Sequence, residues 1–168
     1  DPEDLTVATE TVKISPKKNG FFYHMGYWLD MNGDGRKDFL TARSNAKKGH
    51  GELLWLEHPE GGLSAAPWEE HVIGSMGDVS FAVYQDLEVY PDELIVFAAQ
   101  FFDHALSATR ISLADGSLVE TRAIDDQNIG SAYNVAVVSL NGTGEMQLLV
   151  NNHETSNRNA AVYAYKFP

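Results

Sequence analysis

Four oxygen-bearing side chains lie close together in the sequence, at Asp30, Asn32, Asp34 and Asp38, with glycines between them. A hard cation such as Ca²⁺ takes about six to eight oxygen ligands at roughly 2.3–2.6 Å. These side chains and the backbone carbonyl of Arg36 could supply most of them. We therefore predict a Ca²⁺ site in this stretch, with a solvated acidic turn as the alternative.

The sequence around this stretch is not that of an EF-hand. An EF-hand needs a bidentate glutamate at its twelfth loop position, and that position is Thr41 here. An EF-hand loop also joins two helices, whereas the flanking segments Phe21–Tyr23, Tyr27–Leu29 and Phe39–Ala42 are short and rich in aromatic or apolar residues. Such segments beside a glycine-rich turn are typical of strands. We therefore expect a β-hairpin connection that ends at Asp38.

The same stretch resembles the FG-GAP/VCBS family, the integrin-type calcium repeats of β-propellers. The resemblance covers Asp30–Leu40 and the later segment Gly51–Pro59, which looks like the strand after the loop in such a blade. In that family the loop binds Ca²⁺ through the side chains at its first, third, fifth and ninth positions and through the carbonyl at its seventh. Residue by residue, the resemblance implies the ligands Asp30, Asn32, Asp34, Asp38 and the Arg36 carbonyl.

Internal repetition supports the expectation of blades. Three apolar pairs begin at residues 39, 94 and 148 and are therefore 55 and 54 residues apart, a period in the range of repeat architectures. Around each pair the same order of short strands recurs. The expected leading strands are Thr11–Ile14, Glu70–Ile73 and Glu120–Ile124, and the expected closing strands are Leu53–Leu56, Ala108–Leu113 and Ala161–Tyr165.

Each unit thus holds about four strands, which is the content of a propeller blade. We predict a single all-β domain of about three blades, with approximate repeats 8–62, 68–116 and 117–168. An ordinary β-sandwich is the alternative. Only the first unit keeps the full calcium pattern. In the second unit Asp86, Glu88 and Asp92 lack the glycines and predict a solvated acidic turn, with a poor second metal site as the alternative.

Three blades do not close a ring, since propellers typically have about four to eight. An open wedge of blades leaves apolar faces and strand edges exposed. We therefore expect a homo-oligomer, in which two copies form a six-bladed ring, or a partner chain or longer parent protein that completes the propeller. Packing as a sandwich would remove that need.

Composition limits the class of partner. At 168 residues, with 43% hydrophobic and 21% charged residues, the chain is long and apolar enough for a real core. The net charge of −12 argues against nucleic acid or an anionic membrane as partner, because both attract a basic face. No apolar run approaches the roughly 20 residues of a membrane-inserted helix. The balance is compatible with cations and neutral sugars.

Histidines offer a second kind of chemistry. His50, His104 and His153 follow the second strand of successive units, so blade convergence could bring them together. With Asp103 or Glu154 they could then bind a transition metal or serve as acid and base. The alternative is that they are scattered loop residues.

Aromatic residues are expected to fill the blade cores rather than bind ligand. This expectation covers Trp28, Trp55, the run Phe21–Tyr23 and the pair Phe101–Phe102.

We predict a calcium-stabilised recognition module that binds carbohydrate or protein through its inter-strand loops. The family resemblance suggests this and a secreted or extracellular location, because such repeats serve in integrins, fungal lectins and cell-surface proteins. One alternative is the propeller part of a sugar-processing enzyme, a lyase or dehydratase with a histidine and metal site. Another is a structural half-propeller that completes a partner chain.

Overall fold

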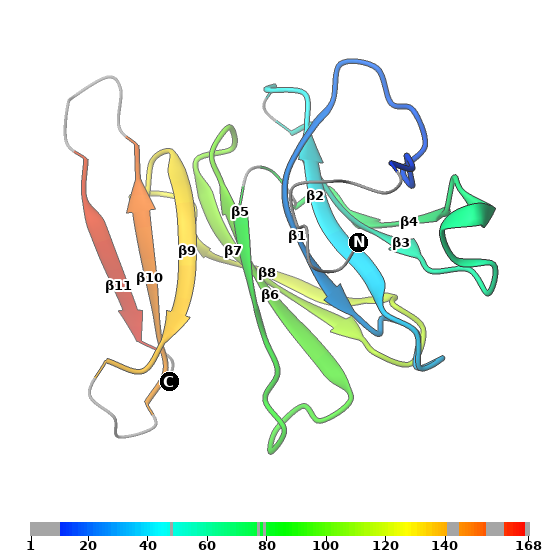
Figure 1. Ribbon diagram of the computed structural model, residues 1–168. Coiled ribbons are helices and arrows are strands. Elements are labelled where there is room, and N and C mark those ends of the chain that lie inside the picture. The colour runs from blue at the N-terminus through cyan, green and yellow to red at the C-terminus, as the bar shows by residue number, and fades with distance from the viewer. Residues whose placement is uncertain are drawn as a thin grey trace, which may run out of the picture.

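The computed structural model describes residues 11–47, 49–76, 78, 80–140, 145–153 and 160–166. In these ranges it contains eleven strands in three antiparallel sheets and one 3-10 helix of four residues (Figure 1). The prediction of an all-β fold is confirmed. No helix in the ranges given is long and apolar enough to cross a membrane.

Each sheet is a meander of strands that follow one another in the sequence. The first sheet contains β1 (Phe22–Leu29), β2 (Asp38–Ser44), β3 (Glu52–Glu57) and β4 (Glu69–Gly74), with η1 (Gly62–Ala65) between the last two. The second contains β5 (Ser80–Tyr84), β6 (Glu93–Gln100), β7 (Ala105–Ser112) and β8 (Leu118–Asp125). The third contains β9 (Ala132–Val138), β10 (Gln147–Asn152) and β11 (Val162–Lys166).

The sheets stack face to face in sequence order, with the second sheet in the middle (Figure 1). One core joins the first and second sheets and includes Leu40, Trp55 and Val96. The other joins the second and third sheets and includes Phe97 and Leu148. Because Val96 and Phe97 are neighbours in β6 and point to opposite faces, the middle sheet is buried on both sides.

The apolar pairs used to find the repeat occupy equivalent places in the three sheets. The three apolar pairs at residues 39, 94 and 148 each occupy the second and third positions of the second strand of a sheet, in β2, β6 and β10. The expected closing strands likewise fall in β3, β7 and β11.

Two of the three expected leading segments form strands, but each closes a sheet instead of opening the next one. Glu70–Ile73 and Glu120–Ile124 lie in β4 and β8, which close the first and second sheets instead of opening the next one. Thr11–Ile14 is not a strand. The reason is that each outer segment pairs antiparallel with the strand just before it in the sequence, and sequential strands commonly pair in this way.

In the part of the chain that the structure describes, the sheets do not close into a ring, and the third has three strands. Large apolar side chains stay exposed on the two outer faces of the stack, including Trp28 at 54% and Val162 at 70%. The sequence expectation that Trp28 fills a core is therefore wrong. The same expectation for Trp55 is confirmed, because Trp55 is only 2% exposed.

Antiparallel pairing places equivalent turns at the same end of the stack. We call the end that carries residues 30–37, 85–92 and 113–117 the lower end, and the end that carries residues 45–51 and 101–104 the upper end (Figure 1). The calcium-type stretch thus lies at the lower end, while His50, His104 and His153 lie at the upper end.

The turn between β7 and β8 belongs to the second sheet and packs against the core that this sheet shares with the first. Gly116 in that turn has a left-handed backbone, φ +70°, and a Cβ added there would lie 2.6 Å from the indole ring of Trp55. The turn therefore packs backbone directly against an aromatic face, which only glycine allows.

Replacing Gly116 by alanine is expected to lower the free energy of unfolding by about 2–4 kcal/mol, from left-handed strain and overlap with Trp55. Gly20→Ala is the matched control, because Gly20 has φ +77° and nothing within 4 Å of an added Cβ. It should lose only the strain part, about 1–2 kcal/mol. Urea unfolding of both variants measures the difference, and equal losses would contradict the packing of this turn.

Candidate functional site

The stretch between β1 and β2 folds around the side chain of Asp30. Its Oδ1 accepts a hydrogen bond of 2.8 Å from the Gly33 amide, and its Oδ2 accepts one of 2.9 Å from the Gly35 amide. Both glycines have left-handed backbones, at φ 75° and 84°. The glycines of the motif are therefore required by the turn itself.

The next two acidic or amide side chains repeat this pattern on a smaller scale. Asn32 Oδ1 accepts from the Asp34 amide at 3.2 Å, and Asp34 Oδ1 accepts from the Arg36 amide at 2.8 Å. The Arg36 guanidinium pairs with Asp34 and also donates to the carbonyl of His58 at 2.8 Å. The loop is thereby tied to the end of the neighbouring strand β3.

Asp38 closes the loop and is fully buried, at 0% exposure. Its carboxylate accepts a hydrogen bond of 2.9 Å from the Met31 amide and another of 2.9 Å from the His58 amide. Burial raises the pKa of Asp38, the two amide bonds oppose that rise, and the nearby charges of Asp34 and Asp30 add to it. The group is thus a buried acid beside two further carboxylates.

The donor set of this loop fits Ca²⁺, because every side chain offers oxygen and the backbone adds the Arg36 carbonyl. Amide hydrogen bonds do not exclude a cation, since each carboxylate has about four acceptor positions. The oxygens of Asp30, Asp34 and Asp38 do not all lie within 4.8 Å of one another. Binding would require them to draw together and Asp34 to exchange Arg36 for the ion. The calcium assignment stays a prediction.

The three candidate histidines lie in turns at the upper end but do not converge on one another as a set. His104 Nε2 lies 3.2 Å from Ser131 Oγ, and the His153 amide donates to the Ser131 carbonyl at 2.8 Å. His50 Nδ1 instead lies 3.3 Å from Asn45 Nδ2 in its own turn.

Within the described ranges, none of these histidines belongs to a group of three metal-ligating side chains whose ligand atoms lie within 4.8 Å of one another. The Asp103 carboxylate instead accepts a hydrogen bond of 2.6 Å from the Gly49 amide, which links two upper-end turns. Glu154 lies outside the described residues.

A chain of aromatic rings crosses the upper end from the first sheet to the second. The His24 and Phe22 rings of β1 lie 5.0 Å apart, and Phe22 lies 6.4 Å from Phe102. Phe102 and its neighbour Phe101 form an edge-to-face pair at 5.0 Å. These separations are within the range of favourable aromatic contacts.

The same chain continues into the third sheet. The Phe101 ring lies 6.0 Å from Tyr133 of β9 and 6.1 Å from His153 after β10. Tyr133 is 50% exposed, and His153 is exposed as well. Phe101 and Phe102 are half-buried, so they do not belong to the buried core that the sequence suggested.

Both ends of this ring chain reach one pocket of about 240 Å³ between the three sheets. Its lining residues come from β1, β5, β9 and β10 and are His24, Met25, Ser80, Tyr133, Asn134 and Asn151. Asn134 Oδ1 accepts a hydrogen bond of 2.7 Å from the Ser80 hydroxyl. This described lining carries amides, a hydroxyl, a thioether and aromatic rings, and it includes no carboxylate, lysine or arginine.

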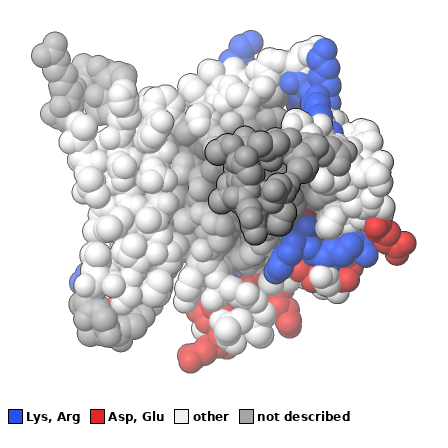
Figure 2. Space-filling view, in the orientation of Figure 1, with Lys and Arg blue, Asp and Glu red and all other residues white. Residues whose placement is uncertain are grey.

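Charged side chains are unevenly distributed over the visible face. Figure 2 shows acidic side chains at the lower end, Lys and Arg side chains at the upper end, and few charged side chains over β9, β10 and β11. The described residues that line the pocket include no acidic, lysine or arginine side chain.

A buried carboxyl group lies directly under the ring chain. Asp78 is 2% exposed, and its Oδ2 accepts a hydrogen bond of 2.6 Å from the Phe102 amide. Its Oδ1 is buried and has no hydrogen-bond partner among the described residues. Burial raises the pKa of Asp78 to about 6, Asp103 adds to the rise, and Phe102 and nearby Ser44 oppose it. The sequence pattern gave no signal for this residue.

Comparison with known proteins finds no match: no family model matches the chain, and no curated protein or solved structure does either. The function must therefore be argued from the geometry.

Adding Ca²⁺ to metal-free protein is expected to raise the free energy of unfolding, by about 2.7 kcal/mol when Ca²⁺ is at 100 times its Kd. Asp34→Asn should abolish most of this gain, because it keeps the acceptor for the Arg36 amide and removes a ligand charge. Asp86→Asn, in the equivalent turn of the second sheet, should keep the full gain. Thermal unfolding with and without Ca²⁺ measures this gain in stability. If Asp34→Asn retained the full gain, the proposed Ca²⁺ site would be refuted.

Asp78 should make stability fall as pH rises from about 4 to 6. Its pKa is higher in the folded chain, at about 6 against 3.8, so the folded state binds more protons in that window. Asp78→Asn should remove this part of the fall, which is at most about 3 kcal/mol. Urea unfolding at pH 4 and pH 7 measures it. Asp126→Asn, an exposed control, should behave like the parent protein, and an equal fall in Asp78→Asn would contradict the assignment.

Proposed function

We propose that this chain is a Ca²⁺-stabilised recognition module of the propeller type that binds neutral carbohydrate at its upper end. One observation carries the proposal: a chain of aromatic rings from all three sheets begins and ends at an uncharged pocket between them. No single sheet could form this surface, so its assembly is a property of the whole fold.

The pocket chemistry favours sugars over other ligands. Apolar faces of sugar rings pack on aromatic side chains, and their hydroxyls pair with amides and hydroxyls such as those of Asn134, Asn151 and Ser80. The volume of about 240 Å³ is below the roughly 300–1,000 Å³ of most small-molecule pockets. The pocket would thus hold one sugar unit, with neighbouring units along the ring chain.

Calcium has a stabilising role in this proposal. The Asp30–Asp38 loop lies at the lower end, away from the pocket, so the ion would act on the fold rather than on the ligand. Extracellular modules bind Ca²⁺ with Kd values of about 10⁻⁴–10⁻³ M, which suits a secreted protein.

A partner surface completes the proposal. The exposed apolar side chains of the outer faces, such as Trp28, Val72 and Val162, would be covered by a second copy or by another chain that continues the ring. In this interpretation each of the three stacked sheets is one blade of a propeller that the partner completes.

The proposal is tested by screening the protein on an array of neutral glycans and titrating the best oligosaccharide by calorimetry. Tyr133→Ala should weaken binding by about tenfold, or roughly 1.4 kcal/mol. Trp28→Ala is the control, because Trp28 is exposed to a similar degree on the outer face of the first sheet. Absence of glycan binding, or loss in Trp28→Ala but not in Tyr133→Ala, would overturn the proposal.

A further inference from the structure

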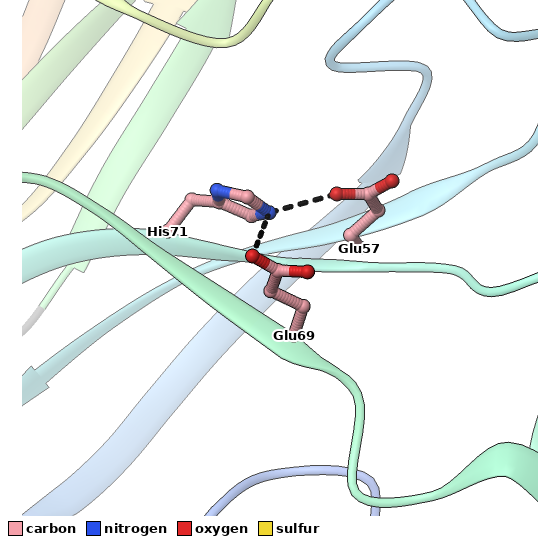
Figure 3. Close-up of side chains that lie close together, drawn as sticks. All are labelled: Glu57, Glu69 and His71. Carbon is pink, nitrogen blue, oxygen red and sulfur yellow. Dashed lines mark hydrogen bonds and ion pairs between the residues drawn. The ribbon is translucent and has the colours of Figure 1, made fainter.

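A second group of metal-ligating side chains lies at the mouth of the β3–β4 hairpin. Figure 3 shows His71 pointing toward both Glu57 and Glu69. The His71 Nε2 atom lies 2.8 Å from Glu57 Oε2 and 4.0 Å from Glu69 Oε1. All three ligand atoms lie within 4.8 Å of one another, and no other described group of three His, Asp or Glu side chains does so.

Strand register builds this group. Glu57 of β3 pairs directly with Glu69 of β4. Trp55 pairs with His71, and this pair lies two positions further from the connection between the two strands. Side chains two apart on a strand share a face, so all four lie on the same side of the first sheet. The Trp55 and His71 rings stack at 4.1 Å with 15° between their planes, which holds the imidazole in place.

Glu57 and Glu69 face each other directly on paired strands and lack the arginine partner that Glu52 and Glu70 have in the same sheet. Like charges directly opposite one another on paired strands are destabilising. On the other face of the same sheet, Arg43 lies between Glu52 and Glu70 and pairs with both. In the described part of the chain, neither Glu57 nor Glu69 has an ion pair with a lysine or arginine.

We propose that Glu57, Glu69 and His71 bind a divalent transition metal of the Zn²⁺ type. Ligand atoms on a tetrahedral zinc lie about 3.3–3.6 Å apart, given Zn–N and Zn–O bonds of about 2.0–2.2 Å. The observed separations of 2.8 and 4.0 Å lie on either side of that value. Glu69 is the member with room to adjust on binding, because its side chain is 75% exposed.

The imidazole distinguishes this site from the calcium-type loop. Nitrogen together with carboxylate oxygen suits Zn²⁺ and similar ions, whereas an all-oxygen set suits Ca²⁺. The ion would neutralise the facing glutamates and join the two ends of the connection that contains η1. His71 also lines a pocket of about 350 Å³ with Asp115 and Ser117 from the second sheet, so the open coordination positions lie near the junction of two sheets.

The test is calorimetric titration of metal-free protein with Zn²⁺ in excess Ca²⁺, which occupies the oxygen sites. The parent protein should bind one Zn²⁺ at this site, and Co²⁺ in its place should give the visible absorption of a four- or five-coordinate ion. His71→Gln and Glu57→Gln should each weaken Zn²⁺ binding by about 100-fold or more, since loss of even an outer-shell partner costs about 10–100-fold.

Two matched controls lie in the adjoining connection. His58→Gln removes a histidine whose ring stacks on Trp68, and Glu60→Gln removes an exposed carboxylate. Both should bind Zn²⁺ like the parent, and far-ultraviolet circular dichroism establishes that every variant is folded. No Zn²⁺ uptake by the parent protein, or unchanged affinity in both folded ligand variants, would overturn the proposal.

Discussion

The buried carboxylate of Asp38 is the constraint on which the lower end of the molecule depends. A carboxylate removed from water is costly unless hydrogen bonds replace its hydration. Its two oxygens take the amides of Met31 and His58, so the start of the β1–β2 loop and the exit of β3 are fixed together. Glu57 immediately precedes His58, and the geometry of both cation candidates therefore depends on one buried acid.

The stacking order explains the spacing of the apolar pairs. The middle sheet buries both faces, so Leu94–Ala99 of β6 is a continuous apolar run, as expected for a strand without a solvated side. The outer sheets bury one face against it, and on the far face of the first sheet Ile14 and the β3–β4 connection residues Ala66 and Trp68 pack with Leu54 and Leu56. A period near 55 residues is thus the length of one meander plus the connection to the next layer.

The sequence predicted the features that depend on local chemistry, namely the strands around the apolar pairs and the glycine turns of the Asp30 loop. It failed for features that depend on which strands pair and in which register. Glu57 and His71 are fourteen positions apart, and the alternation Trp-x-Glu followed by Glu-x-His becomes a ligand set only if β4 pairs with β3. Assigning Glu70–Ile73 to the next blade hid that pairing. The pocket and the ring chain were equally hidden, because their residues come from all three sheets.

The meander also places the calcium-type loop and the uncharged pocket at opposite ends of the molecule. Met25, which lines the pocket, lies five positions before Asp30 along β1, and at about 3.3 Å per residue this places roughly 17 Å between the Asp30 loop and the pocket. That is about two Debye lengths at physiological salt, so the charge of an ion at the lower end is largely screened from a ligand at the pocket. Any influence of Ca²⁺ on ligand affinity must therefore act through the packing of the first sheet, which supplies His24 and Met25 to the pocket, and not through direct electrostatics.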